Sequence, residues 1–244
     1  MTSRESTSIL PRATPKLPDL GWTNRLLVGA FAAIQWPWLL RSLDGGSKAE
    51  KARLLGRLGL APDALPNLGS WKADTGLLHL VVDHILEHRP ERVVEFGCGA
   101  SSLVIARALK LAGCGKLTSF DQHADFVEAT RGWLAEHHVD ADIRHAPLVA
   151  SPEWPGLWYD TGALAPGIDL MIVDGPPWTV HPMTRAGAGS LFALLSPGGT
   201  VILDDAARPG ERLVAGAWRK AFPWMSFRYW GGGAKGTLIG TRPA

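Results

Sequence analysis

The chain of 244 residues is poor in cysteine and has almost no excess of charge of either sign. Its two cysteines, Cys98 and Cys114, form neither a C-x-x-C pair nor a Cys/His cluster, so a reducing, cytoplasmic setting is expected. Lysine and arginine together number 25, against 23 aspartate and glutamate residues. This balance gives no reason to expect nucleic acid as a partner, and a small-molecule substrate fits it better.

A signal peptide and an apolar run of full membrane-spanning length are also lacking. Residues 1–20 are polar and contain three prolines, so we expect a disordered tail there. Residues 26–40 are nearly continuous in apolar side chains but fall short of the roughly 18 to 20 residues that cross a bilayer. Three interpretations of residues 22–43 stay open: a helix packed on its own domain or on a second copy of the chain, a peripheral helix at a membrane surface, and a membrane span.

The rest of the chain alternates between strand and helix patterns. A short helix is predicted over 48–60, and the apolar positions of 75–88 recur at helical spacing. Further elements are predicted as strands at 92–96, 116–120, 142–145, 168–173 and 200–203, and as helices near 101–112, 124–138, 182–195 and 210–222. Two final strands, 226–230 and 236–241, flank a glycine-rich turn and pair as an antiparallel hairpin. The order predicts an α/β fold with a doubly wound, mostly parallel sheet behind an N-terminal helical extension.

The turn after the strand of residues 92–96 is the most informative motif. Gly97 and Gly99 follow an apolar strand directly and precede a helix, and glycine lets a backbone approach a ligand without a Cβ in the way. The helix N-terminus at Ser101 and Ser102 favours a carboxylate or a phosphate. Asp121 ends the next strand, where a carboxylate accepts hydrogen bonds from two ribose hydroxyls. A nucleotide-like cofactor is therefore predicted.

Two residues near this turn argue against a dinucleotide. A dinucleotide-binding turn carries a third glycine, and Ser102 stands at that position. Glu95, in front of the turn, is poorly placed beside a pyrophosphate but suits a cofactor with a cationic amino-acid end. An NAD(P)-dependent oxidoreductase therefore stays only as an alternative.

From Trp71 to Arg242 the chain resembles the class I S-adenosylmethionine-dependent methyltransferases, and their small-molecule O-methyltransferases in particular. The matching motifs are Glu95 to Gly99, Phe120-Asp121, Asp169 to Pro177, Leu195 to Asp205 and the terminal hairpin. The resemblance implies a Rossmann-like, seven-stranded sheet whose last strand inserts antiparallel between the fifth and sixth strands. It also implies an S-adenosylmethionine site formed by Glu95, Gly97, Gly99, Ser101, Ser102, Asp121, Gln122, Ala146 and Asp174.

Within that site the resemblance assigns a part to each region. Gly97 and Gly99 would lie beside the methionine portion of the cofactor, and Asp121 would accept from the ribose. Gln122 would lie beside the adenosine, and Ala146 would belong to the adenine pocket.

Three aspartates extend the resemblance to catechol-type O-methyltransferases, which bind magnesium with an aspartate after strand four and an Asp-Asn pair after strand five. The corresponding residues, Asp174, Asp204 and Asp205, are hard oxygen ligands of the kind Mg²⁺ takes. Two departures count against the metal: Asp205 replaces the asparagine, and the lysine that those enzymes place shortly after the strand-four aspartate is absent.

Asp174 and His181 are the predicted catalytic residues. Asp174 ends a strongly apolar strand, and it should face the site because an unpaired carboxylate is costly to bury. A histidine has an ordinary pKa near 6.5, so His181 is suited to accept a hydroxyl proton, although it could equally cap the next helix. Arg185 is expected either to hold a substrate carboxylate or to pair with an acid.

Together these features predict methyl transfer from S-adenosylmethionine to an oxygen of a small-molecule acceptor by in-line displacement, with Mg²⁺ as an assisting ion. Nitrogen is the competing acceptor, and a non-catalytic or membrane-associated protein of the same fold is the alternative function. The expected organisation is a tail at 1–20, a helical extension at 21–70 and a methyltransferase domain at 71–244. A homodimer or a membrane contact through residues 22–43 is expected in addition.

Overall fold

The structure, a computed structural model, describes residues 21–244, so the tail predicted for residues 1–20 lies outside the described residues. The helices are α1 (Gly21–Ser42), α2 (Lys48–Leu58), α3 (Thr75–His88), α4 (Ala100–Ala112), α5 (Ala124–Glu136), the 3-10 helix η1 (Thr184–Leu194) and α6 (Pro209–Ala221). The strands are β1 (Arg92–Phe96), β2 (Lys116–Asp121), β3 (Asp142–His145), β4 (Leu148–Ala150), β5 (Leu157–Tyr159), β6 (Ile168–Val173), β7 (Leu195–Leu203), β8 (Ser226–Trp230) and β9 (Thr237–Thr241).

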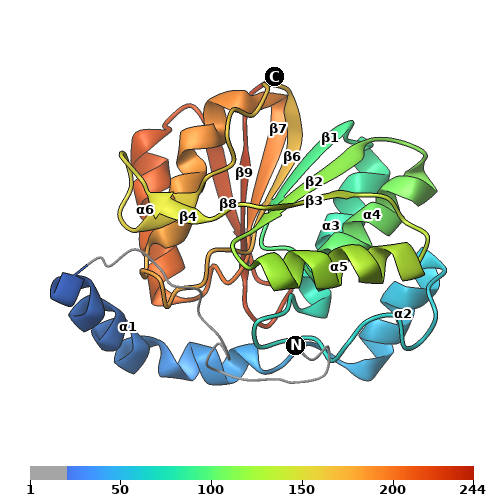
Figure 1. Cartoon of the computed structure of the whole chain (residues 1–244), viewed down its shortest axis with the longest axis horizontal. Coiled ribbons are helices and arrows are strands. Elements are labelled where there is room, and N and C mark those ends of the chain that lie inside the picture. The colour runs from blue at the N-terminus through green and yellow to red at the C-terminus, as the bar shows by residue number, and fades with distance from the viewer. Residues whose placement is uncertain (1–20) are drawn as a thin grey trace.

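Seven strands form one twisted sheet in the order β3-β2-β1-β6-β7-β9-β8 (Figure 1). From β3 to β7 the neighbouring strands are parallel, whereas β9 runs antiparallel to both β7 and β8. The predicted doubly wound sheet is confirmed, and so is the antiparallel insertion of the last strand, which lies between β7 and β8. Because β8 and β7 both run antiparallel to β9, the turn between β8 and β9 opens at the edge where the parallel strands end.

Two hydrophobic cores lie on opposite faces of this sheet. Along β6, Leu170 and Ile172 enter one core while Met171 and Val173 enter the other, as the two-residue period of a strand requires. Helices α2 to α5 cover the first face, and η1, α6 and the small antiparallel sheet of β4 and β5 cover the second. Leucines of residues 54–68 belong to the first core, so this part of the helical extension is packed into the main body.

The helix that precedes β1 begins and ends at residues that the sequence marks clearly. Asp74 is the N-cap of α3, and its Oδ1 accepts a hydrogen bond of 2.8 Å from the backbone N–H of Leu77. Arg89 takes a left-handed conformation at the C-cap and Pro90 follows it, which ends the helix. The other carboxylate oxygen of Asp74, Oδ2, accepts from the backbone N–H of Lys235 in the turn between β8 and β9.

Two segments differ from the predicted elements. The helix expected over 182–195 is the 3-10 helix η1. Its glycines let aromatic rings pack against its backbone: a Cβ at Gly187 would lie 2.7 Å from the Trp158 ring. Gly189 packs in the same way against Trp154. The segment between β3 and β6, which carries no clear pattern in the sequence, contains the short strands β4 and β5.

Helix α1 lies along the edge of the sheet where the parallel strands end (Figure 1). Its Asn24 side chain donates to the carbonyl of Val180 at 3.1 Å, and the carbonyl of Ser42 accepts from the N–H of Ser70 at 2.6 Å. Within residues 21–244, none of the helices combines the length and apolar character that crossing a membrane requires. From its position beside the ends of the parallel strands, α1 covers the edge at which a doubly wound sheet binds its ligands.

Candidate active site

Strand register brings the predicted site residues into one row. Phe96 of β1 pairs with Phe120 of β2 and with Val173 of β6, and Val173 pairs with Leu203 of β7. The next residue on each strand therefore lies at the same edge of the sheet. These residues are Gly97, Asp121, Asp174 and Asp204.

The backbone of the glycine turn disfavours side chains at both glycines, and space is tight at Gly97. Gly97 and Gly99 have φ values of +98° and +152°, which L side chains rarely adopt. A Cβ at Gly97 would lie 3.0 Å from the carbonyl carbon of Asp174, and one at Gly99 would lie 3.4 Å from the ring of Phe126. The turn thus exposes backbone without side chains at the start of α4, which suits a ligand that approaches its N–H groups.

Glu95 supports this turn from inside the protein. Its side chain is fully buried, and its Oε2 accepts hydrogen bonds from the hydroxyls of Ser102 and, at 2.6 Å, Ser119. The Ser102 hydroxyl in turn accepts from the N–H of Gly99 at 2.9 Å. Burial raises the pKa of Glu95 to about 7, although the serine hydroxyls oppose this shift. Its Oε1 is buried and has no hydrogen-bond donor among the described residues, so one acceptor is left for a cationic group.

The residues predicted for the adenosine side lie together at the ends of β2 and β3. Asp121 is buried, and its Oδ1 accepts from the N–H of His123 at 2.8 Å. Burial raises the pKa of Asp121 to about 7. Gln122 is also buried and its Oε1 has no donor in the described part of the chain, while Ala146 donates its N–H to the carbonyl of Asp121 at 2.9 Å. These contacts provide polar acceptors for a nucleoside beside an apolar wall.

On the other side of the turn, three aspartates converge. One carboxylate oxygen from each of Asp174, Asp204 and Asp205, here called the aspartate triad, lies within 4.8 Å of the other two. Asp205 has a left-handed backbone with φ 59°, a conformation that aspartate tolerates better than most residues. The triad lies at the ends of β6 and β7, as the strand pattern predicts.

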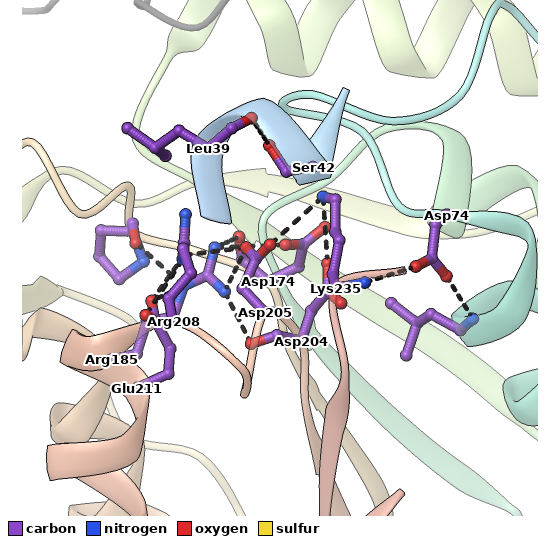
Figure 2. Close-up of polar contacts among 12 residues, drawn as sticks. Leu39, Ser42, Asp74, Asp174, Arg185, Asp204, Asp205, Arg208, Glu211 and Lys235 are labelled. Atoms are coloured by element: carbon purple, nitrogen blue, oxygen red, sulfur yellow. Dashed lines mark hydrogen bonds and ion pairs between the residues drawn. The ribbon is translucent and has the colours of Figure 1, made fainter. Parts of the chain in front are cut away.

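Three buried cations contact the triad (Figure 2). We call Arg185, Arg208 and Lys235 the cation set. Arg185 lies 3.3 Å from Oδ1 of Asp174 and 3.0 Å from Oδ2 of Asp205, and it also donates to the carbonyls of Asp174, Pro176 and Asp204. Arg185 therefore pairs with acids and ties the end of β6 to the end of β7.

The other two cations complete the pairing. Arg208 contacts Oδ2 of Asp205 at 2.8 Å and Oε1 of Glu211 at 2.5 Å. The Nζ of Lys235 lies 3.5 Å from Oδ2 of Asp204 and 3.5 Å from Oδ1 of Asp205. Both oxygens of Asp205 are thus occupied by cations.

These contacts set the ionisation of the cluster. Burial alone would raise the pKa of Asp205, but Arg208 and Lys235 outweigh it and the pKa is lowered. For Asp204, burial and the neighbouring Asp205 raise the pKa far above its ordinary value. Burial would lower the pKa of Lys235, yet Asp205 and Asp204 outweigh it and raise the pKa. The site therefore keeps an ammonium ion between two aspartates.

Burial also raises the pKa of Asp174, while Arg185 and Lys235 oppose the shift. The carboxylate of Asp174 is the most exposed of the triad, with 11% of the side-chain surface accessible. A partly exposed carboxylate of raised pKa beside the glycine turn is suited to exchange a proton with a ligand.

A divalent metal does not fit this cluster. Mg²⁺ binds carboxylate oxygens at about 2.1 Å, so an ion on either oxygen that faces Lys235 would lie no more than about 5.6 Å from its Nζ. At an effective dielectric constant of about 20, the repulsion between the two ions would be about 6 kcal/mol. The predicted metal ligands do converge, but the cation set already neutralises them.

His181 does not have the hydrogen bonding of a general base. Its Nδ1 accepts a hydrogen bond of 3.0 Å from the backbone N–H of Met183, and burial lowers the pKa of the ring. In the neutral ring the other nitrogen then carries the proton. The ring thus accepts from the backbone of Met183, the residue that precedes η1.

Lys235 is a site residue that sequence reasoning missed. It lies in the turn between β8 and β9, and only the strand directions reveal that this turn opens beside the triad. On α1, Gln35 is fully buried, and both polar atoms of its side chain have no partner among the described residues.

Comparisons with known proteins agree with this geometry. Residues 94–206, which include the glycine turn and the triad, match a family model described as a methyltransferase domain. No curated protein sequence matches the chain.

Solved structures of similar fold include an SAH-bound methyltransferase, PaMTH1, from Podospora anserina, with a TM-score of 0.54, 14% identity, and 95% of this chain and 100% of that chain covered. The O-methyltransferase from Bacillus cereus, crystallised with SAH, has a TM-score of 0.53, 14% identity and coverage of 88% and 99%. The O-methyltransferase TomG from Streptomyces achromogenes, in complex with SAM, has a TM-score of 0.51, 16% identity and coverage of 81% and 89%. At these identities the likeness supports the fold.

Proposed function

The chain is a class I S-adenosylmethionine-dependent methyltransferase, and on this premise we propose that it methylates an oxygen of a small-molecule acceptor. The proposal rests on one observation. Asp174 is a partly exposed carboxylate of raised pKa, and its backbone packs against Gly97 of the glycine turn. A hydroxyl acceptor must lose a proton during methyl transfer, and this carboxylate lies where it can take that proton. A neutral amine attacks through its own lone pair and has no need of a base before methyl transfer.

The cofactor half of the site comprises the turn and the ends of β2 and β3. S-adenosylmethionine, when bound, supplies an electrophilic methyl group on a cationic sulfur. Gly97 and Gly99 offer their backbone to the amino-acid end, and Glu95 offers its unpaired Oε1 beneath them. Asp121 is placed to accept from the ribose hydroxyls, and Gln122 presents a buried acceptor for the adenosine.

The acceptor half uses charges instead of a metal. Arg185 fixes Asp174 through both its carboxylate and its carbonyl, so the base cannot rotate freely. Helix α1 lies along the ends of the parallel strands, and Asn24 joins it by a hydrogen bond to Val180 in the loop after β6. We do not propose a role for Mg²⁺, because Lys235 and the two arginines neutralise the triad.

The outer face of α1 supports a contact with a further surface. Its large apolar side chains Trp22, Leu26, Ile34 and Trp36 are each more than half exposed. The same face of a second copy would cover them, and so would a membrane surface, since tryptophans and flanking arginines suit the headgroup region. Light scattering of the purified chain and sedimentation with anionic vesicles distinguish the two. The free cysteines fit a cytoplasmic setting.

Methyl transfer from isotopically labelled S-adenosylmethionine to a panel of phenols, aliphatic alcohols and amines tests the proposal. We expect O-methylated products, and we expect Asp174→Asn to lower the rate by about 10²- to 10⁴-fold, as the loss of a general base does. The affinity for S-adenosylhomocysteine should stay within threefold. Products methylated only on nitrogen, or an unchanged rate in Asp174→Asn, would contradict it.

A further inference from the structure

The position of Lys235 is fixed by its own backbone. Its N–H donates to Oδ2 of Asp74 at 3.1 Å, and its carbonyl accepts from the N–H of Ala207 at 3.0 Å. The turn that carries it is closely packed: a Cβ at Gly233 would lie 2.7 Å from the Asp74 carboxylate. These contacts fix the position from which the Lys235 side chain extends.

The side chain of Lys235 lies among the carboxylates of the aspartate triad (Figure 2). The ammonium group lies 3.5 Å from one oxygen of Asp204 and from one oxygen of Asp205, and only 4% of Lys235 is exposed. The other oxygen of Asp204 is buried and has no hydrogen-bond donor in the described residues. One carboxylate oxygen from each aspartate lies within 4.8 Å of the other two, and this chain places its own lysine beside them.

We propose that Lys235 is a built-in cation that takes the place of a divalent metal in the acceptor half of the site. The wild-type chain then needs no metal, because the ammonium supplies positive charge beside the triad. As part of the chain, it cannot leave the site as a bound metal ion can. Removal of this one charge should let Asp204 and Asp205 bind a divalent cation through the two oxygens that face the ammonium, while Arg185 and Arg208 stay on the other side of Asp205. The inference rests on the proposed function, since it concerns the charges around the acceptor.

Titration of Mn²⁺ into the full chain tests this proposal, with free Mn²⁺ measured by electron paramagnetic resonance. The proteins are the wild type, Lys235→Met and a control, Lys220→Met, which removes an exposed lysine of α6. We expect Lys235→Met to bind one Mn²⁺ at least tenfold more tightly than the wild type and the control. Asp205→Asn in the Lys235→Met background should abolish this gain.

Thermal unfolding gives a second measurement, which applies even where Lys235→Met is poorly stable. Lys235→Met leaves buried carboxylates without their partner, so its melting temperature should fall, and Mg²⁺ should raise it again while the wild type does not respond. If Lys235→Met does not fold, Lys235→Gln replaces it in both measurements. The proposal is overturned if neither variant gains Mn²⁺ affinity, or if the wild type binds Mn²⁺ through Asp205 as tightly as the variant.

Failure of this inference is distinguishable from failure of the proposed function. Titration of S-adenosylhomocysteine into the same proteins reports on the cofactor half alone. A wild type that does not bind S-adenosylhomocysteine would overturn the proposed function, whatever the Mn²⁺ result. Tight Mn²⁺ binding by a wild type that also binds S-adenosylhomocysteine would overturn only the role of Lys235.

Discussion

The two halves of the site are built in different ways. The cofactor half comes largely from one short segment, residues 95–102, whose glycine backbone is supported by the serine hydroxyls on Glu95. The acceptor half contains no such segment. Its charges come from the ends of β6 and β7, from η1, from α6 and from the turn before β9. Local backbone geometry shapes the first half, and long-range charge balance shapes the second.

The largest expected effect lies in the acceptor half. Arg185→Met removes the ion pair of Asp174, one of the ion pairs of the buried Asp205 and a donor to three carbonyls, so it should lower the free energy of unfolding by about 3 to 5 kcal/mol. Urea unfolding measures the change. The matched control, Arg144→Met, removes an exposed arginine that pairs with Asp142 and should cost about 1 kcal/mol or less. Equal costs would show that the buried charges are no more important than exposed ones.

The next effect concerns the buried acid of the cofactor half. The pKa of Glu95 rises from an ordinary 4.5 to about 7, so the folded chain holds its proton over a wider pH range than the unfolded chain. This stabilisation is complete below pH 4.5 and is lost as the pH rises through 7, a difference of about 3 kcal/mol. Unfolding of the cofactor-free wild type and Glu95→Gln at pH values from 4.5 to 8 measures it. Parallel pH curves for the two proteins would refute it.

The glycine backbone should decide cofactor affinity. Gly99→Ala forces a side chain onto a φ of +152°, and a strain of about 1 to 3 kcal/mol should weaken S-adenosylhomocysteine binding at least tenfold. Gly113→Ala is the control, since this glycine has a φ of +63° and open space around it, far from the turn. Calorimetry should find its affinity within twofold of the wild type. A Gly99→Ala chain that binds normally would remove the turn from the cofactor site.

The smallest expected effect concerns one of the hydroxyls that donate to Glu95. Ser119→Ala removes the hydroxyl that donates to Oε2 at 2.6 Å, so the pKa of Glu95 should rise further. A hydrogen bond contributes about 0.5 to 1.5 kcal/mol, which shifts the pH dependence of stability upward by about 0.4 to 1 pH unit. Denaturation curves at closely spaced pH values detect this shift. A shift to lower pH would mean that the hydroxyl does not stabilise the carboxylate.

The same contrast explains what the sequence can predict. The strands, the glycine turn, and the positions of Asp121 and Asp174 follow from local patterns, because each is fixed by residues within a few positions along the chain. The role of Lys235 follows from strand order and direction, which no local pattern contains. The packing of Trp154 and Trp158 against the glycines of η1 also joins segments that are distant in the sequence, so no local pattern predicts it.

The division into a cofactor half and an acceptor half is tested most directly by the affinity for S-adenosylhomocysteine, measured by calorimetry in a matched pair of variants. Asp121→Ala should weaken binding at least tenfold, because it removes the acceptor for the ribose hydroxyls. Lys235→Met should leave the affinity within threefold of the wild type, because its charge belongs to the acceptor half. Equal losses in the two variants, or an unchanged affinity in Asp121→Ala, would contradict the account.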